Sequence, residues 1–165
     1  MLRKLFLAIT LAIVLLVAGC SSLPDMGANT ASDRYQILKK AELGNNWQMY
    51  QMKIDLAAEQ ELDILLRLAN GDKVDGYFFL EEGDTVAFEI AGNSVFYKSA
   101  NTDQKGNIKS DRFSFTASQA QGTTYTLTFK NEEDKDSKSA SVSVFCEVIL
   151  PASASIYIPI EPKSK

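Results

Sequence analysis

The sequence predicts an all-β protein built as an antiparallel β-sandwich. Three observations support this class: apolar and polar residues alternate with period two in several stretches, these stretches are rich in β-branched and aromatic residues, and Asn or Gly turn signals separate them. Alternation with period two places every second side chain on the same face of a strand. We therefore expect strands that each bury one face and are joined by tight turns.

The predicted strands follow one another from Tyr35 onward. Their alternating segments are residues 50–56, 62–68, 86–90, 113–117, 125–129 and 140–148. The turn signals between them are Asn45-Asn46, Asn70-Gly71-Asp72, Glu82-Gly83-Asp84, Gly92-Asn93 and Gln121-Gly122. Asn and Gly supply the positive φ angles that tight hairpins need. Residues 101–111 and 131–139 are longer polar stretches, which we interpret as loops.

Two segments fit the alternation less clearly. Residues 56–69 contain many helix formers and could form a short amphipathic helix, but the alternation over residues 62–68 favours a strand. Residues 151–165 hold three prolines together with alternating isoleucines. This segment can lie extended along a sheet edge, but it cannot donate a full ladder of hydrogen bonds.

The first 19 residues have the organisation of a cleaved signal peptide. Arg3 and Lys4 precede an apolar run from Leu5 to Gly19. This run of fifteen residues is shorter than a membrane-spanning helix, which needs about 20 apolar residues. A cleaved signal is therefore the better interpretation.

The apolar run ends in Val17-Ala18-Gly19-Cys20, where a branched apolar residue and two small residues precede a cysteine. This pattern resembles the lipobox of bacterial lipoproteins. The resemblance implies signal recognition by Val17, Ala18 and Gly19, cleavage before Cys20, a diacylglyceryl thioether on its sulfur, and usually acylation of the new amino group. Two or three acyl chains, at about 0.8 kcal/mol per buried CH₂, give a stable anchor. The alternative is an ordinary secretory signal with a chance cysteine.

These features predict four regions in the chain. Residues 1–19 are the signal peptide, residues 20–34 the lipidated N-terminus and a flexible tether, residues 35–150 the β-sandwich, and residues 151–165 a proline-containing C-terminal extension. Cleavage leaves 146 residues, which suffice for one domain with its own core. We expect an extracytoplasmic protein of the bacterial cell envelope, held on membrane lipid through Cys20.

Charge and residue types exclude several classes of function. Arg3 and Lys4 leave with the signal, so 15 of the 17 basic residues remain against 21 acidic ones, a formal charge of −6 that does not suit nucleic-acid binding. The chain has no histidine, which removes Ser-His and Cys-His nucleophile pairs and the commonest metal ligand. Once Cys20 is lipidated, only Cys146 remains, so no intramolecular disulfide can form. Its place on the apolar face of an alternating strand predicts a buried thiol, the alternative being a reactive or intermolecularly bridged one.

Paired carboxylates are the remaining candidates for catalysis. They occur within residues 59–63 and 81–84, but Glu61 and Asp63 share the solvent side of an alternating strand, and the second group occupies a turn. Residues 132–136 offer oxygen ligands to calcium but lack the spacing of a known calcium loop. We therefore expect no catalytic residue, no metal site and no cofactor other than the covalent lipid on Cys20.

Three segments carry a resemblance to a known domain family. They are residues 76–84 (GYFFLEEGD), 86–90 (VAFEI) and 122–131. The third segment contains the pattern G-x-x-Y-x-L-x-F-x-N. Their order and spacing resemble a GOLD (Golgi-dynamics) domain over residues 35–148. The resemblance implies a compact antiparallel β-sandwich used for protein–protein contact. The chain departs from the eukaryotic cargo receptors of this family because it has one cysteine in the domain, no heptad run and no C-terminal apolar span.

Aromatic residues in consecutive positions are the candidates for a contact patch. A run of rings on a strand presents them to both faces, so Tyr77 and Phe79 lie on the face opposite Phe78. The residues Phe96 and Tyr97 form a second run, and Trp47 follows a turn signal. These five residues form an apolar contact patch for a partner, unless another part of the chain covers them.

The sequence thus predicts a non-catalytic protein-interaction module whose partner is an envelope or extracellular protein. The alternative is a carbohydrate- or cell-wall-binding module whose Tyr and Trp rings stack on sugars. A shallow groove with Tyr or Trp beside Asn and Asp would favour sugar, whereas a flat apolar patch would favour protein. A third possibility, an envelope enzyme using carboxylates, has the least support.

Overall fold

The computed structural model describes residues 34–99, 109–133 and 141–159. This part of the chain forms two five-stranded antiparallel sheets, which confirms the predicted β-sandwich. The lipobox residues Val17, Ala18, Gly19 and Cys20, like the tether, lie outside the described residues. Among the described residues, no helix is long and apolar enough to cross a membrane.

The two sheets are named sheet A and sheet B. Sheet A consists, in spatial order, of β1 (Tyr35–Gly44), β2 (Trp47–Ala57), β9 (Ser141–Pro151), β4 (Lys73–Glu82) and β7 (Ser110–Thr116). Sheet B consists of β10 (Ser155–Tyr157), β3 (Glu61–Arg67), β8 (Thr124–Lys130), β5 (Ala87–Ala91) and β6 (Val95–Lys98). A short 3₁₀ turn, η1 (Gln119–Gln121), precedes β8.

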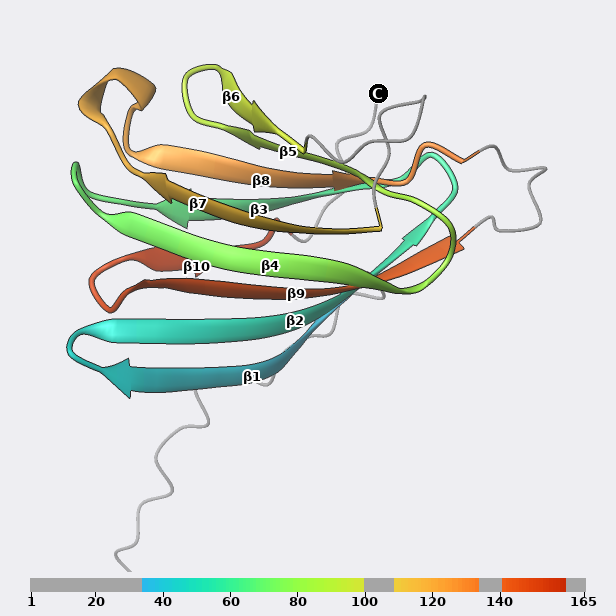
Figure 1. Cartoon of the computed structure of the whole chain (residues 1–165), viewed down its shortest axis with the longest axis horizontal. Helices are drawn as coiled ribbons and strands as arrows, with labels where there is room; N and C mark the ends of the chain where they lie inside the picture. Colours follow the sequence, from blue (N-terminus) through green and yellow to red (C-terminus); the bar gives the residue numbers. More distant parts are fainter. Residues whose placement is uncertain (1–33, 100–108, 134–140, 160–165) are drawn as a thin grey trace, which may run out of the picture. The chain divides into compact units, whose positions relative to one another are not determined.

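Eight of these strands have the connectivity of a jelly roll. The chain passes from one sheet to the other at nearly every connection, so that the order β2-β9-β4-β7 faces the order β3-β8-β5-β6 (Figure 1). Strand β1 is added outside β2, and β10 is added outside β3. The two added strands therefore form one edge of each sheet.

The core lies between the sheets and is built from the apolar side of each alternating strand. Phe78 of β4 meets Phe88 of β5 and Phe129 of β8 from the opposite sheet, with ring centroids 4.7 and 5.1 Å apart. All three rings are buried. This core uses only one face of each sheet, so the outer faces of the described strands lie outside it.

The predicted turns form where Asn and Gly allow a left-handed backbone. The β1–β2 hairpin turns through Asn45 and Asn46, whose φ angles are 49° and 63°. Two consecutive positive φ values define the hairpin turn whose twist matches that of the flanking strands. Gly83 has a φ of 93° and ends β4 before the chain crosses to sheet B.

The two ambiguous segments both form strands. Residues 61–67 form β3, as the alternation predicts, and not a helix. The C-terminal segment supplies β10, a three-residue edge strand paired with β3. The boundary expected at residue 150 needs correction, because β9 runs to Pro151 and the side chains of Ala154 and Ile158 are buried in the core. The expected loop over 101–111 also ends earlier, because β7 begins at Ser110.

Strand β1 differs from the other long strands in having no buried residue. Its pairing with β2 is interrupted by register shifts between Ile37 and Lys39 and between Glu42 and Gly44. Its two large apolar residues in these irregular positions, Leu38 and Leu43, are 46% and 48% exposed. Only the start of the strand packs against the core, through the partly buried Tyr35 and Ile37, and the rest is held by pairing with β2.

Candidate functional site

The outer face of sheet A carries an aromatic patch formed by Tyr77, Phe79 and Phe145. Alternation along β4 buries Phe78 and turns Tyr77 and Phe79 outward, as the sequence predicts. On the neighbouring β9, Phe145 pairs directly with Phe79, and the two rings stack with centroids 5.0 Å apart and an interplanar angle of 21°. The Tyr77 ring centroid lies 5.9 Å from that of Phe145. Phe79 is 39% exposed, so the aromatic patch faces solvent.

A guanidinium group borders the aromatic patch on the β7 side. Arg112 pairs with Tyr77 across β4 and β7, and its Cζ lies 6.0 Å from the centroid of the Tyr77 ring. This arrangement is a cation–π contact. Burial raises the pKa of Tyr77 and the nearby Glu147 carboxylate raises it further, whereas Arg112 opposes them. The Tyr77 hydroxyl therefore stays neutral at physiological pH.

Most of the polar groups next to the aromatic patch already have hydrogen-bond partners within the chain. Gln51 Nε2 donates to Glu147 Oε2 at 2.7 Å. Asp111 accepts from the hydroxyl of Tyr97 at 2.7 Å and from the backbone N–H of Arg112 at 2.8 Å. A shallow depression of about 380 Å³ beside the patch is lined by Tyr77, Phe78, Phe79, Ser110, Asp111 and Arg112.

The described residues leave the aromatic patch uncovered. The C-terminal segment, which could have covered it, pairs with β3 in sheet B. Residues 56–69, the other candidate, run from the end of β2 into β3. The outward orientation predicted for Tyr77 and Phe79 by strand parity is therefore confirmed, and within the described residues Tyr77 is half-buried and Phe79 exposed.

The other predicted aromatic residues lie elsewhere. Tyr97 packs against the core, and its hydroxyl bonds Asp111 across the two sheets, so it joins β6 to β7. Burial and this hydrogen bond raise the pKa of Tyr97 to about 12. Phe96 is 40% exposed and its ring meets those of Phe115 and Tyr125 at 5.4 and 5.9 Å. The structure thus separates Phe96 and Tyr97 from the aromatic patch.

Trp47 shares the outer face of sheet A but not the aromatic patch. It is half-buried and pairs with Pro151, whereas Phe79 pairs with Phe145, six residues away along β9. At about 3.4 Å per residue, this spacing is about 20 Å. A partner that contacts both Trp47 and Phe79 would therefore have to span about 20 Å.

Phe145 is the patch residue that sequence reasoning missed. In the alternation of β9 it occupies the polar side, with Ser143 before it and Glu147 after it. A ring among polar outward positions was a signal of a surface role. Its partnership with Phe79 depends on the β4–β9 register, which joins residues more than sixty positions apart.

The outer face of sheet B carries a second hollow. This groove, of about 550 Å³, lies over β10, β3 and β8 and is lined by Leu65, Arg67, Thr124, Ser155, Ile156 and Tyr157. Tyr157 is 60% exposed, and Arg67 is also exposed. The groove therefore combines an accessible ring with hydroxyl and guanidinium donors.

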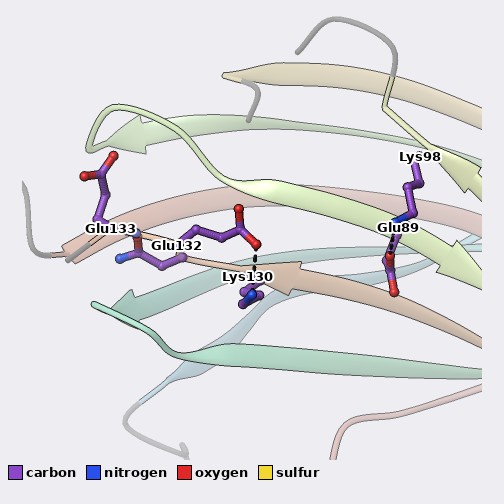
Figure 2. Close-up of polar contacts among 6 residues, drawn as sticks. Glu89, Lys98, Lys130, Glu132 and Glu133 are labelled. Atoms are coloured by element: carbon purple, nitrogen blue, oxygen red, sulfur yellow. Dashed lines mark hydrogen bonds and ion pairs between the residues drawn. The ribbon is translucent and has the colours of Figure 1, made fainter. Parts of the chain in front are cut away.

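Two ion pairs lie elsewhere on or next to sheet B. Lys98 Nζ lies 3.4 Å from Glu89 Oε2, and Lys130 Nζ lies 2.8 Å from Glu132 Oε1 (Figure 2). The hydrogen bond to Glu132 raises the pKa of Lys130. Glu132 belongs to the acidic segment considered for calcium, whose residues 134–136 lie outside the described residues. No cluster of three or more potential metal ligands occurs among the described residues.

The remaining candidates for chemistry are also placed. Cys146 is fully buried, and this burial raises the pKa of its thiol, as expected for an inert core residue. Glu61 and Asp63 face the solvent side of β3, and Asp63 accepts a hydrogen bond of 2.8 Å from Thr128. Both carboxylates therefore lie on the outer surface of sheet B.

Comparisons with known proteins give similarity in fold at low sequence identity. No family model matches the chain, and no curated protein matches it in sequence. The chain is similar to an uncharacterized conserved protein with a double-stranded β-helix domain from Klebsiella pneumoniae, at 11% identity and a TM-score of 0.42, covering 76% of this chain and 81% of that one. It is also similar to a CBM4 structure, at 7% identity and a TM-score of 0.28, covering 76% and 78% of the two chains.

A third similarity is to the acid-stable capsid of Helicobacter pylori bacteriophage KHP30. Its identity is 11% and its TM-score 0.30, and it covers 64% of this chain and 98% of the capsid chain. At these identities, and with all three TM-scores under 0.5, the similarities bear on neither ligand nor activity.

Proposed function

We propose that this chain is a lipid-anchored, extracytoplasmic protein of the bacterial envelope whose β-sandwich binds another protein without catalysing a reaction. The observation that supports this proposal is the stacked, solvent-facing pair of Phe79 and Phe145 on the outer face of sheet A. The core is complete without these rings, since it is built from the opposite side of the same strands. Their stacking adds to the sheet surface, but Phe79 still exposes 39% of its area to water, which a partner could cover.

The chemistry of the aromatic patch favours a protein over a sugar as its partner. Its most exposed ring is that of Phe79, which offers apolar area without a polar group, whereas Tyr and Trp add a hydrogen-bonding group. The neighbouring Glu147 and Asp111 already accept hydrogen bonds from Gln51, Tyr97 and the backbone. Aromatic and Arg residues at the centre of a patch are the residue types that dominate protein–protein binding energy.

The proposal of a non-catalytic role rests on the residue types available. The chain has no histidine, and its one described cysteine is buried. A catalytic base would then have to be a carboxylate, Lys or Tyr. The paired carboxylates Glu61 and Asp63 lie on the solvent side of β3, where Asp63 accepts a hydrogen bond from Thr128.

The anchor is proposed from the sequence Val17-Ala18-Gly19-Cys20. Cys20→Ser should abolish incorporation of labelled fatty acid and leave an uncleaved precursor. Processing and labelling of this variant at the normal level would refute the lipid anchor. Because the test reads only modification of the N-terminus, it is independent of the binding surface.

The binding surface is tested by site-specific photo-cross-linking in native membranes. A benzophenone side chain is placed at Phe79 in one variant and at Thr126, on the outer face of sheet B, in a matched control. We expect a defined protein adduct from position 79 that is absent from position 126 and is lost when Phe145→Ser is added. The free energies of unfolding of the variants must agree within about 1.5 kcal/mol, which is the upper value for the ring–ring interaction that Phe145→Ser removes.

Two results of that experiment would contradict the proposal. One is the same set of adducts from positions 79 and 126, which would indicate random collision. The other is an adduct at position 79 that survives Phe145→Ser in a folded protein, because the stacked pair would then not be the binding element.

The groove on sheet B supports a second candidate function, binding of envelope carbohydrate. Tyr157 offers an exposed ring, and Thr124, Ser155 and Arg67 offer donors around it. A ring flanked by polar groups can stack on a sugar and hydrogen-bond its hydroxyls. Retention of the protein on purified peptidoglycan, lost with Tyr157→Ala and kept with Phe79→Ser, would favour this function over protein binding.

A further inference from the structure

Strand β1 is an open edge outside the eight-stranded jelly roll. Sheet A ends at β1 on one side and at β7 on the other. The β7 edge is bridged to β6 of sheet B by the Tyr97 hydroxyl, which reaches Asp111 at 2.7 Å and the carbonyl of Arg112 at 3.2 Å. Among the residues that the structure describes, no strand pairs with the outer side of β1 (Figure 1). The unpaired N–H and C=O groups of such an open edge are a template for pairing with another strand.

The burial of β1 is low for a strand of its length. Ten residues are ordered in it, and none of them is buried. Tyr35 and Ile37, at the start of the strand, pack against the core. Residues 39–42 are held mainly by their pairing with β2, and this pairing must offset the entropy cost of ordering the backbone. A second strand on the open side would add hydrogen bonds to residues 39–42, which lie between the two register shifts.

We infer that β1 pairs with β1 of a second copy of this chain, antiparallel about a two-fold axis at Ala41. Such a dimer would join the two copies of sheet A into one continuous sheet. The two-fold axis makes the contact self-complementary, so each opposite-charge pair on one side of Ala41 is repeated on the other.

The register follows from which face of sheet A each residue occupies. Lys40 pairs with Tyr50, and Glu42 pairs with Gln48, two residues on the core side of β2. Ala41 pairs with Met49 on the outer side. Paired residues in a continuous sheet point to the same face. The two-fold axis must therefore place one residue opposite the same residue of the second copy, and it cannot lie between two consecutive residues.

Among the residues between the two register shifts, Ala41 is the axis position that matches opposite charges. An axis at Lys40 would place this lysine against itself, and an axis at Glu42 would do the same with the glutamate. An axis at Ala41 places Lys40 of each copy against Glu42 of the other, with the small Ala41 side chains meeting at the centre. Opposite charges in directly facing positions stabilise a strand pair, and like charges destabilise it.

The side chains that would pair are available for this contact. Neither Lys40 nor Glu42 forms an ion pair within the part of the chain that the structure describes. Lys40 Nζ instead lies 5.2 Å from the centroid of the Tyr50 ring, which keeps it on the core side of β1. The two register shifts limit the regular ladder to residues 39–42, so the dimer is short and its trapping by a covalent bond is the suitable readout.

The test uses disulfide trapping of the purified full-length chain. Facing residues of an antiparallel pair have Cα atoms about 4.5–5.5 Å apart, which falls within the range of disulfides. Ala41→Cys should therefore give a disulfide-linked dimer under mild oxidation. Ser114→Cys, an exposed position on the other edge strand of sheet A, is the matched control. The unmodified chain gives the background from its own cysteines.

Charge exchange then tests the register. In the Ala41→Cys background, Lys40→Glu or Glu42→Lys alone places like charges together twice, so the dimer yield should fall to that of the control. The double exchange Lys40→Glu with Glu42→Lys restores opposite charges and should restore the yield. A cysteine at Ala41 that cross-links no faster than one at Ser114 would overturn the dimer, and a folded double variant without recovery would overturn the register.

A second measurement keeps the inference testable if the cysteine variants fail to fold. Unlabelled and ¹⁵N-labelled full-length chains are mixed and treated with a zero-length carbodiimide, and the peptides are analysed by mass spectrometry. A Lys40–Glu42 cross-link between a labelled and an unlabelled chain supports the proposed register. Cross-links that carry one label only would show contact within single chains and would overturn it.

Discussion

The hydrogen bond from Tyr97 to Asp111 is the structural feature that links the β6 edge of sheet B to the β7 edge of sheet A. We predict that Tyr97→Phe lowers the free energy of unfolding by about 1–2 kcal/mol at pH 7. The phenol has one proton, and the shorter contact, 2.7 Å, is with the Asp111 carboxylate. A hydrogen bond to a charged group contributes about 1.5–3 kcal/mol, and partial exposure reduces that value.

The pH dependence reports the burial of the Tyr97 hydroxyl together with its contact to Asp111. The pKa of Tyr97 is raised from 10.0 to about 12, first by burial and then by the hydrogen bond to Asp111 and its charge. At about 1.36 kcal/mol per tenfold change in acidity, the full difference would be about 2.7 kcal/mol. Solvent screening at this half-buried site reduces it to about 1 kcal/mol. The sign is fixed by linkage: the contribution is complete below pH 10 and is lost as the pH rises from 10 to 12.

The assay is urea unfolding of residues 21–165 at several pH values from 7 to 11.5. The quantity of interest is the difference between wild type and Tyr97→Phe, in which the titration of other residues cancels. Tyr157→Phe is the control, because Tyr157 is 60% exposed. The reasoning is refuted if Tyr97→Phe and Tyr157→Phe are equally stable at pH 7, or if the difference from wild type grows above pH 10.

Three further substitutions test the packing of sheet A. Gly76→Ala should lower stability by about 1–3 kcal/mol, because the added methyl group would collide with the Phe113 ring; urea unfolding measures this loss. Cys146 should react with a maleimide only after denaturation, and Cys146→Ser should lower stability by about 1–3 kcal/mol by burying a hydroxyl; rapid labelling of the native protein would contradict both. Gln48→Ala should remove the bond of 2.8 Å to the carbonyl of Ala154 and speed hydrogen exchange in β10.

Strand alternation was sufficient to predict the faces of most strands. The segments around residues 50–56 and 125–129 form β2 and β8, with the predicted apolar side in the core. Parity also placed Phe78 inside and Phe79 outside. These predictions succeeded because the face of a residue depends only on its position along its own strand.

Features that depend on irregular pairing or on distant strands could not be predicted in this way. The two register shifts in β1 remove the period-two signal from residues 35–44, so its status as a strand was not evident. The stacking of Phe79 on Phe145 depends on the β4–β9 register. For the same reason, Trp47, Phe96 and Tyr97 were grouped with Tyr77 and Phe79 although they occupy different places.

The separation between core and outer face makes stability and binding experimentally separable in this protein. A buried ring such as Phe129 lies in the core between the sheets, and replacing it by Ala should lower stability by about 3–5 kcal/mol. Phe79 and Phe145 lie outside this core and meet mainly each other and Tyr77. Truncating them removes an interaction of about 0.5–1.5 kcal/mol and leaves no internal cavity, so the variants should stay folded. Any binding that such a folded variant loses can then be attributed to the aromatic patch itself.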